Sequence, residues 1–131
     1  MTPADQTTFG VDRYPYAPGD CLSACVATLL DVKVSDVPIF LDERDPYDGI
    51  WLERLDRWLA DHHGLHVSQI EIDVSSPEEL SLFAPDFPYV LCGTSIRGRD
   101  HAVVAIGGEV VHDPHPSRTG LVRGLRMIVL G

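Results

Sequence analysis

Apolar residues recur at helical spacing in two stretches of the first half of the chain. In "CLSACVATLL" they return every three or four residues from Cys21 to Leu30, and Gly19 and Asp20 precede the run as its expected cap. A second stripe, which Asp48 is expected to cap, stops at Gly64. That stripe consists of Trp51, Leu55, Trp58, Leu59 and His62. The pattern predicts two amphipathic helices, joined by "VSDVPIF" with at most one helical turn and by the loop "LDERDPYDG".

The period changes after the second helix. "LHVSQIEI" alternates imperfectly, "SPEEL" is typical of a short capped turn, and four further stretches are typical of strands separated by Gly, Pro and polar clusters. Those stretches are "YVLCGTS", "HAVVAI", "EVVHD" and "LVRGLRMIVL". Gly107 and Gly108 form a two-residue hairpin signal. Helices followed by antiparallel strands predict one α+β domain over residues 1–131, with residues 1–18 as an irregular lead-in.

Composition narrows the functional classes. The chain has 131 residues, 44% of them hydrophobic, and a net charge of −10, so it is long enough to bury a core and is expected to repel the phosphate backbone of nucleic acids. No stretch has the length of a membrane span, and the N-terminus does not have the pattern of a secretion signal. These features predict a cytoplasmic protein that binds neither nucleic acid nor membrane.

Three cysteines require an explanation, because an odd number cannot pair within one chain and a reducing cytosol keeps thiols free. Cys25 and Cys92 are assigned to the core, where free cysteine is common. Cys21 differs because it falls in the first helical turn, where unpaired backbone N–H groups and the helix dipole stabilise a thiolate. The position is suited to a nucleophile.

A base and an acid follow in the second half of the chain. His101 opens the apolar strand "HAVVAI" after a polar loop, at the end of a predicted sheet. Asp113 ends the next strand, where its carboxylate is expected to accept the second imidazole N–H and hold the tautomer. Cys21, His101 and Asp113 are therefore the candidate catalytic residues.

"GDCLSACVATLL", "DHAVVAI" and "VVHDPHPS" together resemble the papain-like cysteine hydrolases, in particular the bacterial branch that processes bacteriocin leader peptides. The segments stand in the order of that branch's nucleophile helix, histidine strand and aspartate strand, and they extend from Gly19 to Ser117. The chain is also similar to small bacterial and phage proteins with a "GDC" helix and an "HDPHPS" segment. The resemblance implies a papain-like fold and cleavage of a peptide or amide, or acyl transfer, through a thioester and without a cofactor.

The papain-like pattern places a glutamine six residues before the nucleophile, where it donates into the oxyanion hole. Here that position is Pro15, which cannot donate. Gln6 is the one glutamine upstream of Cys21, and a looped lead-in would have to return it to the site. Gln6 and the backbone N–H of Cys21 are the candidate oxyanion donors.

Other roles for the polar residues stay open. Cys21, Cys92 and three histidines could supply zinc ligands, but they lack the short ligand spacings of zinc sites, and strand alternation predicts that His112 and Asp113 point to opposite faces. His112 and His115 are expected to shape a rigid loop beside the cleft and to contact substrate, and Arg118 is a candidate for a substrate carboxylate. A catalytically degenerate papain-like binding module is the alternative to an enzyme, and a zinc protein is the less favoured one.

Overall fold

The elements that frame the candidate site are two helices and a sheet. A computed structural model describes residues 1–7, 20–40, 50–75, 77–81, 84–96 and 100–131. The helical elements are α1 (Cys21–Leu30), the 3₁₀ turn η1 (Val34–Asp36), α2 (Ile50–His63) and the 3₁₀ turn η2 (Pro77–Leu80). The strands are β1 (Val67–Val74), β2 (Tyr89–Thr94), β3 (Asp100–Ile106), β4 (Glu109–His112) and β5 (Arg123–Leu130).

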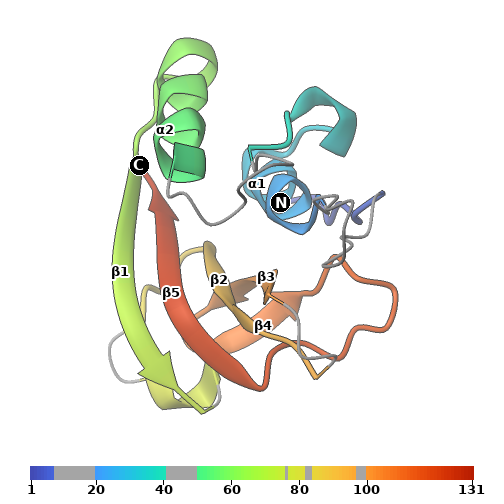
Figure 1. The fold of residues 1–131 in the computed structure, drawn as a ribbon, viewed down its shortest axis with the longest axis vertical. Coiled ribbons are helices and arrows are strands. Elements are labelled where there is room, and N and C mark those ends of the chain that lie inside the picture. The colour runs from blue at the N-terminus through green and yellow to red at the C-terminus, as the bar shows by residue number, and fades with distance from the viewer. Residues whose placement is uncertain (8–19, 41–49, 76, 82–83, 97–99) are drawn as a thin grey trace.

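The strands form one antiparallel sheet in the order β1-β5-β2-β3-β4, and the helices lie together beside it (Figure 1). The expected α+β class, with N-terminal helices packed on a C-terminal antiparallel sheet, is confirmed. Among the described residues, no helix combines the length and the apolar character that crossing a membrane requires.

Buried apolar side chains of the described residues form two clusters. The larger cluster joins α1 and α2 to the sheet through buried residues such as Cys25, Leu55 and Val104. Neighbouring strand residues belong to different clusters, because side chains alternate along a strand: Val104 lies in the larger one and Val103 in the smaller. The remaining members of the smaller cluster are Val74, Leu80, Tyr89, Leu91, Ala105, Leu121 and Met127.

The glycines that were expected to end a helix and to form a hairpin turn do so in the structure. Gly64 follows α2 with a φ of 65°, as expected for a glycine that ends a helix. Gly107 and Gly108 connect β3 to β4 with φ values of 59° and 87°, the conformation that a two-residue hairpin turn requires. The proposed caps Gly19 and Asp48 lie outside the described residues.

Candidate active site

Cys21 is the first residue of α1, and its side chain is partly exposed. Asp20 is the N-cap residue of α1, as expected, but its side chain forms no capping hydrogen bond. Its buried carboxylate instead accepts hydrogen bonds from the backbone N–H of Thr7, at 2.8 and 3.0 Å, and from the Thr7 hydroxyl, at 2.6 Å. The start of α1 is thus tied to the N-terminal segment.

His101 is the second residue of β3 and pairs with Gly93 on β2. The backbone of β5 approaches Gly93 so closely that a Cβ there would lie 1.8 Å from the carbonyl oxygen of Arg123. Gly93 is also paired with Gly124, beside an irregularity in the β2–β5 ladder. Glycine at this position therefore allows the strands next to His101 to pack together.

The imidazole of His101 donates from Nε2 to Oδ1 of Asp113 at 2.6 Å, and each side chain is 3% exposed. Asp113 follows the last residue of β4, so the hairpin between β3 and β4 brings the two together. The backbone N–H of His115 donates to Oδ1 at 2.9 Å, and that of Gly120 donates to Oδ2 at 2.7 Å. The acid is therefore held in one orientation by three donors.

The Cys21 side chain also lies close enough to His101 to interact with its imidazole and raise its pKa. Since Nε2 faces Asp113, the nitrogen that remains for sulfur is Nδ1. The structure thus brings Cys21, His101 and Asp113 together with the histidine in the centre. This arrangement can hold a thiolate next to an imidazolium and can return the imidazole proton to a leaving group.

Electrostatics of the buried pair favour the charged forms of both residues. Burial disfavours the imidazolium, but the hydrogen bonds with Asp113 and Cys21 outweigh burial and raise the pKa of His101 to about 9. Burial also disfavours the carboxylate, but its bonds with His101, His115 and Gly120 outweigh that effect and lower the pKa of Asp113 to about 2. Near neutral pH the site therefore holds an imidazolium against a carboxylate.

The other two thiols lie in a different environment. Cys25 is fully buried, and Cys92 packs against the same cluster of buried side chains. Burial raises the pKa of Cys25 well above its usual range and raises the pKa of Cys92 to about 12. The assignment to the core is confirmed for Cys25, whereas Cys92 packs against the core and stays partly exposed.

Gln6 lies in the N-terminal segment, residues 1–7, which has no helix or strand. Its backbone N–H donates to the carbonyl oxygen of Pro114 at 3.1 Å, and its side-chain oxygen Oε1 is buried. The next residue, Thr7, binds Asp20. The N-terminal segment therefore folds back to residues that adjoin Cys21 and Asp113 in the sequence. Pro15 and the rest of the lead-in up to residue 18 lie outside the described residues.

The three candidate substrate-loop residues make contacts within the protein. His112 donates from Nε2 to the carbonyl oxygen of Ala4 at 2.7 Å and is largely buried. His115 stands edge-on to the His101 ring, with 6.1 Å between centroids, and its Nδ1 accepts a bond from the backbone N–H of Ser117. Arg118 forms a two-point ion pair with Asp5, at 2.7 and 2.9 Å, and also donates to the backbone oxygen of Asp113.

These contacts show what the sequence reasoning missed. The predicted substrate residues His112 and Arg118 hold the N-terminal segment, and they do so from positions more than a hundred residues away in sequence. The sequence held one signal for this arrangement. Gln6 lies fifteen residues before Cys21, so it can serve the site only if the N-terminal segment folds back toward α1. His112 and Asp113 have different hydrogen-bond partners, Ala4 and His101.

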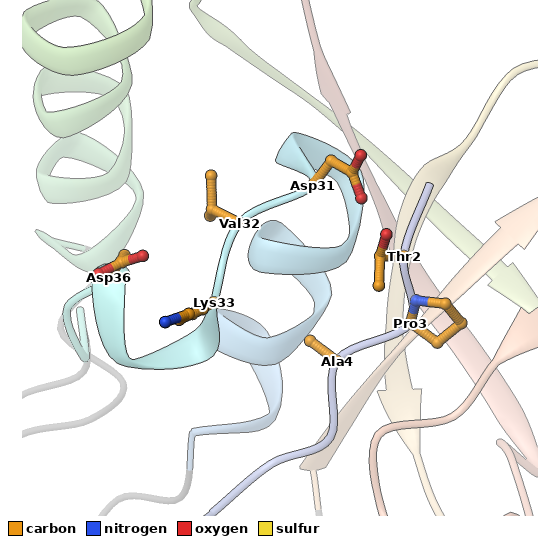
Figure 2. A pocket seen from close by; sticks show the side chains of 7 residues that line it. All are labelled: Thr2, Pro3, Ala4, Asp31, Val32, Lys33 and Asp36. Carbon is orange, nitrogen blue, oxygen red and sulfur yellow. The ribbon is translucent and has the colours of Figure 1, made fainter.

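A surface pocket of about 550 Å³ lies elsewhere, beyond the C-terminal end of α1 (Figure 2). It is lined by Thr2, Pro3, Ala4, Asp31, Val32, Lys33 and Asp36. Because Cys21 begins the ten-residue helix that ends before this pocket, about 15 Å of helix separates the two. In the part of the chain that the structure describes, no three His, Cys, Asp or Glu side chains gather in a way that would hold a metal ion.

Comparison with family models, curated proteins and solved structures gave no match to this chain.

Proposed function

We propose that the protein is a papain-like cysteine hydrolase or acyltransferase that acts on a peptide or amide bond. The observation that carries the proposal is the position of His101, whose imidazole hydrogen-bonds to the buried carboxylate of Asp113 and also interacts with the Cys21 side chain. A histidine that served only to fill the core would not need a partly exposed thiol on one side and a buried acid on the other.

In the proposed reaction, the Cys21 thiolate attacks the carbonyl carbon while His101 is protonated. The carbon–sulfur bond forms, the carbonyl electrons move to oxygen, and collapse of this intermediate expels the leaving group, which takes the proton from His101. His101, now neutral, then removes a proton from water or from another acceptor nucleophile, which attacks the thioester and releases Cys21. Asp113 keeps Nδ1 directed at sulfur and stabilises the imidazolium.

The oxyanion that develops in this reaction needs hydrogen-bond donors. The backbone N–H of Cys21 is one, at the N-terminus of α1 where backbone N–H groups lack helical partners. Gln6 is the second, because its own backbone is bound beside Asp113 and the next residue is bound beside Cys21. This glutamine takes the role that Pro15, at the usual spacing, cannot take.

The substrate class follows from chemistry and charge. A net charge of −10 favours basic or neutral peptides over acidic polymers, and the proposed reaction involves no nucleic acid, membrane or cofactor. The reaction requires Cys21 as a thiol, and Cys21, Cys25 and Cys92 are all free, so we propose a reducing compartment, the cytoplasm.

The test is acylation of the folded protein by p-nitrophenyl acetate. We expect rapid release of nitrophenolate with an acetyl group on Cys21, located by peptide mass mapping. His101→Ala should slow this step by about 10²-fold or more, since a positioned acid–base group contributes at least that much. A panel of fluorogenic peptide amides then tests turnover of the natural bond type.

The matched control is His66→Ala, because His66 also faces a carboxylate, Asp56, at 3.3 Å, but on the exposed surface. This variant should react like the wild type. If wild type and His101→Ala are acylated at equal rates while both remain folded, the catalytic proposal is wrong, and a papain-like binding module becomes the better description of the protein.

A further inference from the structure

The N-terminal segment, residues 1–7, runs beside α1 toward the candidate active site, and Thr2, Pro3 and Ala4 are seen along this course in Figure 2. The backbone N–H of Ala4 donates to Oγ1 of Thr28 on α1 at 3.0 Å. The carbonyl oxygen of Ala4 accepts a bond from His112 at the end of β4. The segment therefore bridges the helix that carries Cys21 and the strand that leads to Asp113.

On one side of Gln6, Asp5 is bound to the loop that contains Asp113. Its carboxylate makes the two-point ion pair with Arg118, whose guanidinium also donates to the backbone oxygen of Asp113. Asp5 and Arg118 are 57% and 48% exposed, and an ion pair at such exposure adds little to the free energy of unfolding. The ion pair instead fixes the position of Asp5 relative to Arg118, because two parallel contacts set both the distance and the direction between the groups.

On the other side of Gln6, Thr7 is bound to the residue that precedes Cys21. Three contacts join its backbone N–H and hydroxyl to the Asp20 carboxylate, which is 5% exposed as a residue. Hydrogen bonds to carboxylate oxygens are among the stronger ones in proteins. With Gln6 itself bound to Pro114, three successive residues are each bound to a residue that adjoins Cys21 or Asp113 in sequence or hydrogen-bonds to it.

We infer that Asp5 and Thr7 are positioning residues that hold Gln6 as the oxyanion donor of Cys21. This inference rests on the proposed function, and it explains how a glutamine far outside the usual spacing serves the site. Asp5 sets the segment relative to Asp113, and Thr7 sets it relative to Cys21. Neither residue touches the reacting atoms.

Two reactions of the same thiol separate this role from a merely structural one. Alkylation by iodoacetamide displaces iodide without forming an oxyanion, so it reports the thiolate and His101 alone. Acylation by p-nitrophenyl acetate passes through a tetrahedral oxyanion and needs the donor as well. A residue that only stabilises the fold should change both rates together or neither.

We expect Gln6→Ala to lower the acylation rate by about 100-fold, the cost of removing one oxyanion donor. Thr7→Val and Asp5→Asn should each lower it by roughly tenfold, because a shift of about 1 Å at a reacting centre is worth up to 100-fold. Alkylation should stay within about twofold of wild type in all three. Thr7→Ser and Asp5→Glu, which keep the hydroxyl and the carboxylate, should restore acylation.

The matched control is Asp73→Asn, because Asp73 forms an equally exposed two-point ion pair with Arg123 away from the N-terminal segment. It should leave both rates unchanged. Adding Thr7→Val to Gln6→Ala should cause no further loss, since the positioned group is already gone.

The outcomes distinguish the two proposals. If wild type is not acylated at Cys21, the proposed function fails and the positioning role fails with it. If wild type is acylated with dependence on His101, but Thr7→Val and Asp5→Asn react at the wild-type rate, the positioning role alone is wrong. A parallel loss of alkylation and acylation in these two variants also overturns it, because that result is a general structural effect.

Discussion

Oδ1 of Asp113 accepts a 2.6 Å hydrogen bond from Nε2 of His101, and neither side chain is more than 3% exposed. The pair buries two ionisable groups beside a thiol that stays partly accessible. Removing one member of such a pair leaves the other without its counter-charge, which is costly inside a protein.

Asp113→Asn should therefore destabilise the fold in a pH-dependent way. The pKa of His101 rises from 6.5 to about 9 on folding, so the stabilisation that it contributes is complete below about pH 6.5 and is lost as the pH rises through 9. The pKa of Asp113 falls from 3.8 to about 2, so its contribution is complete above about pH 4 and is lost as the pH falls through 2. We expect a loss of about 3 kcal/mol near pH 6 and a smaller loss near pH 10, measured by urea unfolding.

Asp56→Asn is the control for that experiment, because Asp56 pairs with an exposed histidine and should show little pH-dependent loss. Equal destabilisation by Asp113→Asn at both pH values would contradict the assigned charge states.

Alkylation should distinguish the three thiols. Burial raises the pKa of Cys25 well above its usual range and raises the pKa of Cys92 to about 12, so neither forms much thiolate near neutral pH. Iodoacetamide at about pH 7.5 should label Cys21 first and should reach the other two mainly after unfolding in urea. Peptide mass mapping gives the order, and faster labelling of Cys25 or Cys92 in the native protein would contradict it.

Gly93→Ala should be strongly destabilising. The added Cβ would lie 1.8 Å from a backbone oxygen and 2.9 Å from the adjoining carbon of Arg123, and backbone cannot move aside as a flexible side chain can. We expect a loss of roughly 3 kcal/mol in the free energy of unfolding, together with displacement of the strand that pairs with His101. Gly131→Ala, whose Cβ would meet nothing within 4 Å, is the control and should be close to neutral.

Tyr89→Phe tests the hairpin that brings His101 and Asp113 together. The buried Tyr89 hydroxyl accepts a hydrogen bond at 3.2 Å from the backbone N–H of Gly108, which phenylalanine would leave buried without that acceptor. The expected cost is about 1 to 3 kcal/mol, with faster amide exchange at Gly108. Unchanged exchange at Gly108 would show that the hydroxyl does not hold the turn.

The predictable parts of the fold are those that depend on residues close together in the sequence. Leu55 and Leu59 recur at helical spacing and are fully buried, and Gly107 and Gly108 form the predicted turn, because periodicity and turn conformation are local properties. The same locality explains why Cys21, at a helix start, and His101, at a strand start, could be selected as candidates.

The contacts of the N-terminal segment could not be predicted in this way. Ala4 binds Thr28 and His112, and Arg118 binds Asp5, through backbone atoms and charges that leave no periodic pattern. Asp20 before a helix is typical of a cap, but a distant threonine competes for its carboxylate, and only the tertiary structure decides between them.

The position of β5 bears on how the molecule is made. This strand follows β1 and β2 in the sequence, yet it lies between them and pairs residues as distant as Val67 and Leu130. Until it is synthesised, β1 and β2 each present an open edge, and the half of the sheet next to α2 is not joined to the half that carries His101. β5 therefore joins the two parts of the sheet, which predicts slow folding dominated by distant contacts and aggregation of chains interrupted before Arg123.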